Sequence, residues 1–366
     1  MHPHEWPWKP QPDYTRLLRT LRRQGEPHHV PFLELSADPE MISAVLGEPA
    51  VSYAVGKAAD REAMEKEADQ KIRFWHLLGY DAFWHRPVLE MPDLLRLESD
   101  DIASMPRDKR RWVDEKAGII TNWEDFERYP WPRAADADLH PIEYAVHHLP
   151  EGMGLIAEAM GVLEPAMWLM GYETFALAIY DQPDLVQAVF DRLADIYVSL
   201  ARALAQMDGV IALWMGDDMG FKTGTMIAPK HLRRFVFPMH QQVAHIAHEQ
   251  GMPFLLHSCG NLEAVMEELI EEVGIDAKHS YEDVIIPVED FAARYGDRIG
   301  IIGGVDMNLL ARGTEEQVRA GTRRILERCA PSGGYVLGSG NTVANYVPVQ
   351  NFLAMLDEGW RYNTSG

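Results

Sequence analysis

The chain has few cysteines, few basic residues and no long apolar run. Two cysteines among 366 residues, Cys259 and Cys329, exclude a disulfide framework, and the first thirty residues lack the apolar core of a secretory signal. Lys and Arg number 34 against 56 Asp and Glu, a net charge of −22, which disfavours nucleic acid or an anionic membrane as partner. No stretch approaches the roughly 20 apolar residues of a membrane-spanning helix. We therefore expect a soluble, cytoplasmic globular protein.

Short runs rich in β-branched and aromatic residues alternate along the chain with segments of helical period. Eight such runs are predicted strands: 30–35, 81–84, 154–158, 210–215, 253–257, 276–279, 299–302 and 335–337. Two of the intervening segments, 262–273 and 315–329, carry apolar residues on one helical face and charged residues on the other. Eight strand and helix units in a chain of this length predict a (β/α)8 TIM barrel rather than an open doubly wound sheet.

The domain organisation follows from where this rhythm is absent. Residues 1–29 are rich in Pro, His and Trp, and we expect them to form an N-terminal arm on the surface. Residues 30–366 then form a single barrel domain. Within it, residues 94–149 interrupt the alternation with turn-forming sequence, so we predict an insertion that covers the barrel mouth.

Chemically active residues follow three of the predicted strands, where a barrel of this type places its active site. His257 and Cys259 are two positions apart, so their side chains point to the same side of the strand. Nitrogen and sulfur ligands suit Zn²⁺, and Glu282, after the next strand, would supply a third ligand and leave the fourth position open. In the alternative interpretation His257 and Cys259 are ordinary core residues, and spacing alone leaves both open.

Two adjacent acids, Asp217 and Asp218, follow another predicted strand and are flanked by glycines. They suit acid–base chemistry or substrate orientation, because neighbouring carboxylates raise one another's pKa. They equally suit helix capping and turn formation. His240, His245 and His248 fall on a predicted helix, where we expect a solvated face.

Four motifs together resemble the uroporphyrinogen decarboxylase superfamily, from about residue 150 to the C-terminus and more loosely back to residue 30. They are Gly-Asp-Asp-Met-Gly at 216–220, Ile-Ala-Pro at 227–229, His-Ser-Cys-Gly-Asn at 257–261 and Gly-Gly-Val-Asp at 303–306. The resemblance implies a (β/α)8 barrel and one of two activities. One branch decarboxylates uroporphyrinogen; the other comprises zinc-dependent methyltransferases that exchange a methyl group with a corrinoid protein, the carrier of cobalamin, and includes methoxyaromatic O-demethylases.

The resemblance is closest to the methyltransferase branch. Decarboxylases carry Arg-Gln-Ala-Gly-Arg after the first strand, whereas residues 32–38 here read Phe-Leu-Glu-Leu-Ser-Ala-Asp, without an arginine for substrate carboxylates. The His-x-Cys zinc ligands of the methyltransferases carry over to His257 and Cys259, and Glu282 falls where the remotely similar cobalamin-independent methionine synthase has a glutamate. The later cysteine ligand does not carry over, because Ser339 stands in its place and a hydroxyl is a poor zinc ligand.

The resemblance therefore implies a zinc-dependent methyltransferase acting on a small compound, for example a methoxyaromatic ether, and a corrinoid protein. Zn²⁺ would lie on His257, Cys259 and Glu282. Asp217 or Asp218 would orient substrate or move a proton, and His279 would support the ligands or replace one. Two alternatives are a metal-free decarboxylase that uses Asp218, and a non-catalytic binding barrel of corrinoid metabolism that lost its site together with the cysteine at 339.

Overall fold

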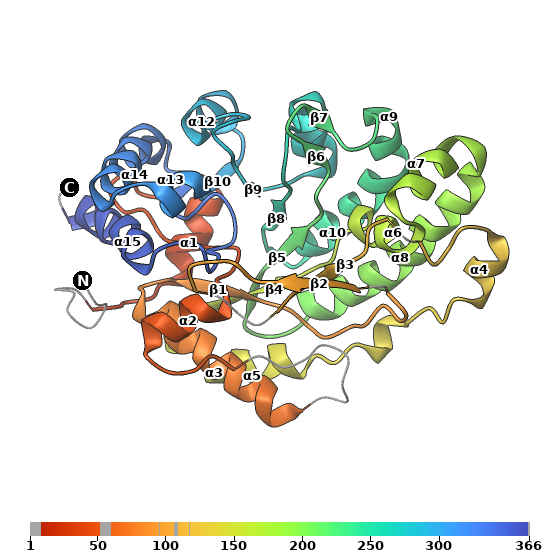
Figure 1. Ribbon diagram of the computed structural model, residues 1–366. Helices are drawn as coiled ribbons and strands as arrows, with labels where there is room; N and C mark the ends of the chain where they lie inside the picture. Colours follow the sequence, from red (N-terminus) through yellow and green to blue (C-terminus); the bar gives the residue numbers. More distant parts are fainter. Residues whose placement is uncertain (1–8, 52–59, 95, 106–108, 117, 365–366) are drawn as a thin grey trace.

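The computed structural model describes residues 9–51, 60–94, 96–105, 109–116 and 118–364. Its centre is a curled sheet of parallel strands (Figure 1). Seven strands stand in the spatial order β1 (Ala82–His85), β4 (Gly154–Glu158), β5 (Val210–Gly216), β8 (Phe254–His257), β9 (Ala277–His279), β10 (Gly300–Ile302) and β11 (Tyr335–Val336). Each corresponds to one of the predicted strands within two residues, because buried parallel strands are short and nearly continuously apolar.

The first predicted strand, 30–35, is an extended segment that pairs with the end of β11. It forms one parallel bridge, between Phe32 and Leu337, with backbone hydrogen bonds on both sides of it. Pro31 lacks an N–H and cannot donate to a longer ladder. The predicted TIM-barrel type of fold is therefore confirmed, with its first strand reduced to this bridge.

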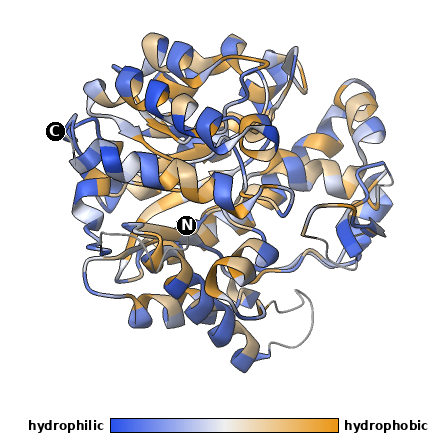
Figure 2. Ribbon diagram, turned by 60° about the vertical axis from the view of Figure 1, so that its left-hand side comes forward, coloured by the Kyte–Doolittle hydropathy of each residue, from blue (hydrophilic) through white to orange (hydrophobic). Residues whose placement is uncertain are grey.

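Helices cover the outside of the sheet, and apolar residues concentrate on the central strands while polar residues face outward (Figure 2). The helices are α1 (Tyr14–Leu21), α2 (Pro39–Leu46), α3 (Arg61–Leu77), α4 (Trp123–Arg128), α5 (His140–His148), α6 (Leu163–Met170), α7 (Tyr172–Asp181), α8 (Pro183–Ala205), α9 (Pro229–His231), α10 (Phe237–Glu249), α11 (Met266–Glu268), α12 (Val288–Tyr295), α13 (Met307–Arg312), α14 (Glu315–Cys329) and α15 (Val349–Thr364). None of the described helices is long and apolar enough to cross a membrane.

The two helices predicted from periodicity differ in regularity. Residues 315–329 form α14 with the predicted bounds, and Thr314 and Gln317 form a capping box at its start. Residues 262–273 instead form a 3₁₀ turn, the short α11 and a π-helical turn, and end at Gly274 in the left-handed conformation. The predicted apolar face is still buried, because periodicity determines which face is covered and not which carbonyl each N–H reaches.

The inside of the curled sheet holds its own apolar cluster, to which α1 contributes. Ala82, Ile156 and Trp214 are fully buried there, together with Leu17 and Leu21 of α1. α1 lies within the predicted arm, residues 1–29: its apolar face packs against this cluster, while Thr15 and Arg19 on its other face are exposed. Amphipathic helices need a partner for their apolar face, and α1 finds one in the sheet interior.

Residues 94–149 form an exposed antiparallel hairpin, β2 (Arg96–Asp100) and β3 (Lys109–Val113), followed by α4 and α5. Asn345, in the loop after β11, holds this hairpin: its side chain accepts a hydrogen bond from Arg110 (2.5 Å) and donates to Asp101 (2.6 Å). The segment thus reaches the C-terminal ends of the strands. A smaller hairpin, β6 (Gly220–Phe221) and β7 (Gly224–Thr225), follows β5.

Candidate metal centre

Three side chains with metal-ligating atoms converge at the C-terminal ends of β5 and β8. The nearest ligand atoms of Asp218, His257 and Cys259 all lie within 4.8 Å of one another. Nε2 of His257 is 3.5 Å from the Cys259 sulfur and 3.6 Å from Oδ1 of Asp218. Zinc binds histidine nitrogen, cysteine sulfur and aspartate oxygen, and catalytic zinc sites carry three protein ligands, so these three residues fit such a site.

Strand register explains why these residues meet. Gly216 at the end of β5 pairs with His257, and His257 pairs with His279 on β9. Residues paired in a parallel sheet lie at the same height and face the same side. Asp218 lies beyond the end of β5, and its Oδ1 accepts a hydrogen bond from the backbone N–H of Cys259 (2.8 Å). That bond ties the two strand ends together.

A chain of hydrogen bonds determines which nitrogen of His257 is available. Nδ1 of His257 lies 2.7 Å from Nδ1 of His279, and Nε2 of His279 lies 3.3 Å from the carbonyl oxygen of Ser339. That carbonyl can only accept, so His279 donates from Nε2 and its Nδ1 must accept from His257. The lone pair of His257 is therefore on Nε2, which faces Cys259 and Asp218.

Burial keeps both imidazoles neutral, as metal ligation requires. Burial lowers the pKa of His257 to about 4, against the opposing charge of Asp218. Burial, assisted by the neighbouring His257 and Lys278, lowers the pKa of His279 well below its usual value. Beneath them, the buried indole of Trp214 packs against both rings, with centroids 6.4 Å and 5.3 Å away, which closes the site from the barrel interior.

The Cys259 thiol is protonated, and two hydrogen-bond donors lie close to its sulfur. Burial and the charge of Asp218 raise its pKa to about 12. Ser280 Oγ and Asn341 Nδ2 each lie 3.4 Å from its sulfur and can donate to it. Those donors disperse charge once a metal displaces the proton. Ser280 is held for this contact with a backbone φ of 83°, which is rare outside glycine.

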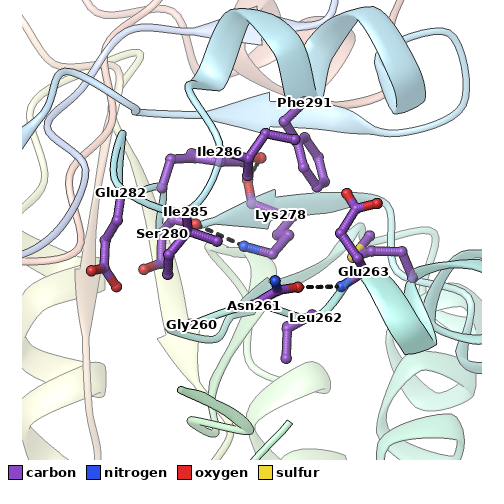
Figure 3. A pocket seen from close by; sticks show the side chains of 12 residues that line it. Gly260, Asn261, Leu262, Glu263, Lys278, Ser280, Glu282, Ile285, Ile286 and Phe291 are labelled. Atoms are coloured by element: carbon purple, nitrogen blue, oxygen red, sulfur yellow. Dashed lines mark hydrogen bonds between the residues drawn. The ribbon is translucent and has the colours of Figure 1, made fainter. Parts of the chain in front are cut away.

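Lys278 is a buried residue of this site that we did not single out from the sequence. Its ammonium donates to the carbonyl oxygen of Ser280 (2.7 Å), and Figure 3 labels both residues. It also donates to the carbonyl oxygen of His279 (3.2 Å), and its nitrogen lies 4.7 Å from the centre of the Tyr281 ring. Burial lowers its pKa to about 8. The signal available in the sequence was a lysine inside a predicted buried strand, a residue type that is rarely buried without partners.

The adjacent acids have different environments. Asp217 is fully buried and accepts hydrogen bonds from the first backbone N–H groups of α6, at Val162, Leu163 and Glu164, and from His240 (2.8 Å). It caps a helix, the structural alternative left open above, and lies outside the metal-ligating cluster. The expected solvated face is wrong for His240, which is fully buried. The side chain of Asp218 is 34% exposed and faces the cluster.

The other two predicted contacts lie elsewhere. Glu282 is exposed, and its carboxylate points away from Lys278 in Figure 3. It belongs to no group of potential metal ligands among the described residues, so the structure brings Asp218 and not Glu282 to His257 and Cys259. Ser339 Oγ donates to Glu34 (2.5 Å), and this serine reaches the site only through its carbonyl.

Comparison with known proteins assigns the chain to a family. The profile described as uroporphyrinogen decarboxylase (URO-D) matches residues 115–362, more than half of the chain. A curated uroporphyrinogen decarboxylase from Thioalkalivibrio sulfidiphilus (strain HL-EbGR7) is 26% identical over 188 residues, 49% of this chain and 50% of the relative. The match thus spans about half the length of that relative.

A solved structure shares the fold. It is a methyltransferase from Methanosarcina mazei, 18% identical, with a TM-score of 0.66 over 95% of this chain and 98% of the other. The profile match, which covers the strands that carry Asp218, His257 and Cys259, shows that the chain belongs to the uroporphyrinogen decarboxylase family.

Proposed function

We propose that the chain is a zinc-dependent methyltransferase that moves a methyl group between a small compound, for example a methoxyaromatic ether, and a corrinoid protein. The observation that carries the proposal is the convergence of Asp218, His257 and Cys259 at the barrel mouth. This ligand set leaves one coordination position for a substrate heteroatom. Membership of the family and the fold shared with an archaeal methyltransferase support it.

The residues around the site have distinct roles in this proposal. Zn²⁺ held there would supply a Lewis acid that stabilises negative charge on the heteroatom from which the methyl group leaves. His279 keeps the lone pair of His257 on Nε2, toward the metal position. Ser280 and Asn341 hydrogen-bond the Cys259 sulfur. Asp218, whose side chain is 34% exposed, is placed to exchange between metal and a substrate proton.

Metal analysis by inductively coupled plasma mass spectrometry tests the ligand set. We expect one equivalent of zinc in the unaltered chain and loss of metal in His257→Ala and Cys259→Ala. Asp218→Asn and Glu282→Gln form a matched pair, because each removes one carboxylate charge near the mouth and only the first removes a ligand. Full metal in Asp218→Asn with loss in Glu282→Gln would restore the sequence-based ligand set. No zinc in the unaltered chain after incubation with excess zinc would refute the proposal.

The activity itself is tested with a panel of methyl ethers, amines and thioethers and free cob(I)alamin as acceptor. The carbon–heteroatom bond breaks with its electron pair on the heteroatom, which takes up a proton, while Co(I) supplies the pair for the new carbon–cobalt bond. Formation of methylcobalamin is followed by its absorbance. Methyl transfer that persists in Cys259→Ala would separate the reaction from this site.

Decarboxylation is the second candidate, because the curated relative is a uroporphyrinogen decarboxylase. The end of the first extended segment disfavours it: Glu34 is buried there, and Ser36 and Asp38 follow, with no arginine to bind substrate carboxylates. Release of CO2 from uroporphyrinogen by the metal-free chain, retained in Cys259→Ala, would favour this candidate over methyl transfer.

A further inference from the structure

A cavity of about 400 Å³ lies at the ends of β1 and β4, beside the candidate metal centre. Residues of the chain after β1, of the open end of the β2–β3 hairpin, of α6 and of α8 line it. Figure 1 labels these elements. The cavity walls combine apolar residues, among them Leu89, Met160, Trp168 and Leu200, with several charged ones. A cavity of this size with both apolar and polar lining suits a small organic molecule that carries charged groups.

Five charged residues line this cavity, and two of them, Arg86 and Glu158, stand directly at the strand ends without pairing to each other. Arg86 forms no ion pair and no hydrogen bond with any residue that the structure describes, although it lines the cavity directly after β1. Glu158, the last residue of β4, likewise has no hydrogen bond or ion pair to a described residue. Burial raises its pKa, while the charges of Arg86 and Lys71 lower it.

Arg86 is exposed to solvent, whereas Glu158 is half-buried and loses hydration. A positively charged ligand group offsets the cost at Glu158, and Arg86 remains free to bind an anionic group. A guanidinium binds a carboxylate through two parallel hydrogen bonds. A carboxylate flanked by aromatic rings suits an ammonium group, and Trp168 and Tyr197 line the same cavity as Glu158. The two charges therefore complement the two ends of one small molecule.

We propose that this cavity binds a zwitterionic ammonium carboxylate with an apolar body, its carboxylate on Arg86 and its ammonium on Glu158. An amino acid with an apolar side chain, or its N-methylated form, has this chemistry. None of Asp218, His257 and Cys259 lines the cavity, so the inference does not depend on methyl transfer. Glu158 pairs in register with Trp214, whose ring lies against His257, so a bound ligand would lie one strand away from the metal position.

Isothermal titration calorimetry tests the inference with a panel of zwitterions: leucine, methionine, phenylalanine and their N,N,N-trimethyl forms. 3-Phenylpropionate and phenethylamine keep the body of phenylalanine and one charge each. We expect at least one zwitterion to bind with a stoichiometry of one, roughly tenfold or more tighter than its singly charged analogues. Arg86→Gln and Glu158→Gln should each weaken binding by about tenfold or more.

The controls separate this site from general charge effects and from the metal. Arg192→Gln on α8 and Glu173→Gln on α7 make the same changes at exposed positions and should bind like the unaltered chain. Metal-free Cys259→Ala should also bind the zwitterion with unchanged affinity. The titration therefore tests the cavity even if the proposed metal site is wrong. Circular dichroism melts verify that the Arg86 and Glu158 variants fold. Absence of binding across the panel, equally tight binding of 3-phenylpropionate, or unchanged affinity in both variants would overturn the proposal.

Discussion

On the β5, β8 and β9 side of the barrel mouth, the polar groups are hydrogen-bonded to one another: His257 to His279, Cys259 to Asp218, and Lys278 to two strand-end carbonyls. On the β1 and β4 side, Arg86 and Glu158 face a cavity without such partners in the described structure. A reacting site gains rate from groups that are already fixed in position. A recognition site keeps groups free for its ligand. The difference agrees with the two proposals above, chemistry on the first side and recognition on the second.

The largest expected effect is loss of metal from the first side only. His257→Ala and Cys259→Ala should retain under a tenth of the zinc of the unaltered chain and lower methyl transfer by at least about a thousandfold, because catalysis of this type depends on the bound ion. Glu158→Gln should keep its full zinc content. Mass spectrometric metal analysis and the methylcobalamin assay check both sides. Metal loss in Glu158→Gln would remove the distinction between them.

A smaller effect is expected at the residue that orients the ligand. His279→Gln should lower zinc affinity by about 10–100-fold, because groups that fix a ligating histidine typically contribute that much. A competition titration against a chromogenic chelator measures the affinity. His245→Gln, at an exposed histidine of α10, is the matched control and should leave it unchanged. Equal affinities in the two variants would contradict the hydrogen-bond chain through His279.

The two adjacent aspartates should separate stability from metal binding. Asp217→Asn places an amide N–H₂ against donors from α6 and His240, and should lower the free energy of unfolding by about 1–3 kcal/mol with zinc retained. Asp218→Asn should lower zinc affinity and change the stability of the metal-free chain by under about 0.5 kcal/mol. Urea denaturation of the metal-free proteins measures both. Loss of zinc affinity in Asp217→Asn together with loss of stability in Asp218→Asn would mean that Asp217 is the metal ligand and Asp218 the structural residue.

The last expected effect is a pH dependence of stability that arises behind the first side. Burial raises the pKa of Glu34, which accepts hydrogen bonds from Ser339 and Tyr80, from 4.5 to about 8. Below pH 4.5 both the folded and unfolded chains hold this proton. As pH rises toward 8 only the folded chain keeps it, so stability falls by up to about 1.4 kcal/mol per pH unit and then levels off. Glu164, whose pKa is also raised to about 8, adds a similar slope.

Glu34→Gln should remove the contribution of this one proton to the fall of the unfolding free energy with pH. Urea denaturation at pH 5, 6.5 and 8 measures that free energy. The glutamine still offers an oxygen to the Ser339 N–H. An unchanged slope in this variant would mean that Glu34 is ionised in the folded chain at pH 7.

Local pattern was sufficient for most of the fold and for two of the three residues of the candidate metal centre. The predicted strands and the bounds of α14 follow from periodicity and capping, which depend on neighbouring residues. His257 and Cys259 could be paired because they are two apart on one strand, and the structure brings their ligand atoms together. The choice between Asp218 and Glu282 could not be made in this way, because it depends on where a loop turns after its strand.

The missed features depend on contacts between distant segments. Asp217 and Asp218 are neighbours in sequence, and only the position of the α6 N-terminus distinguishes the capping residue from the ligand. Lys278 and the cavity beside Glu158 require the arrangement of several strand ends and loops. The position of α1 in the sheet interior requires partners from the far end of the chain.

The position of α1 also sets the order in which the barrel can be completed. Besides the inner cluster, α1 contacts β10 and β11, from which most of the chain separates it in sequence. During synthesis α1 leaves the ribosome well before those strands, so its apolar face lacks this part of its packing until they emerge. Contacts between such distant segments carry a large loop-closure cost and form late. The inner cluster around Leu17 and Leu21 is thus expected to be completed last. Until then these two side chains are the apolar surface that a chaperone would bind.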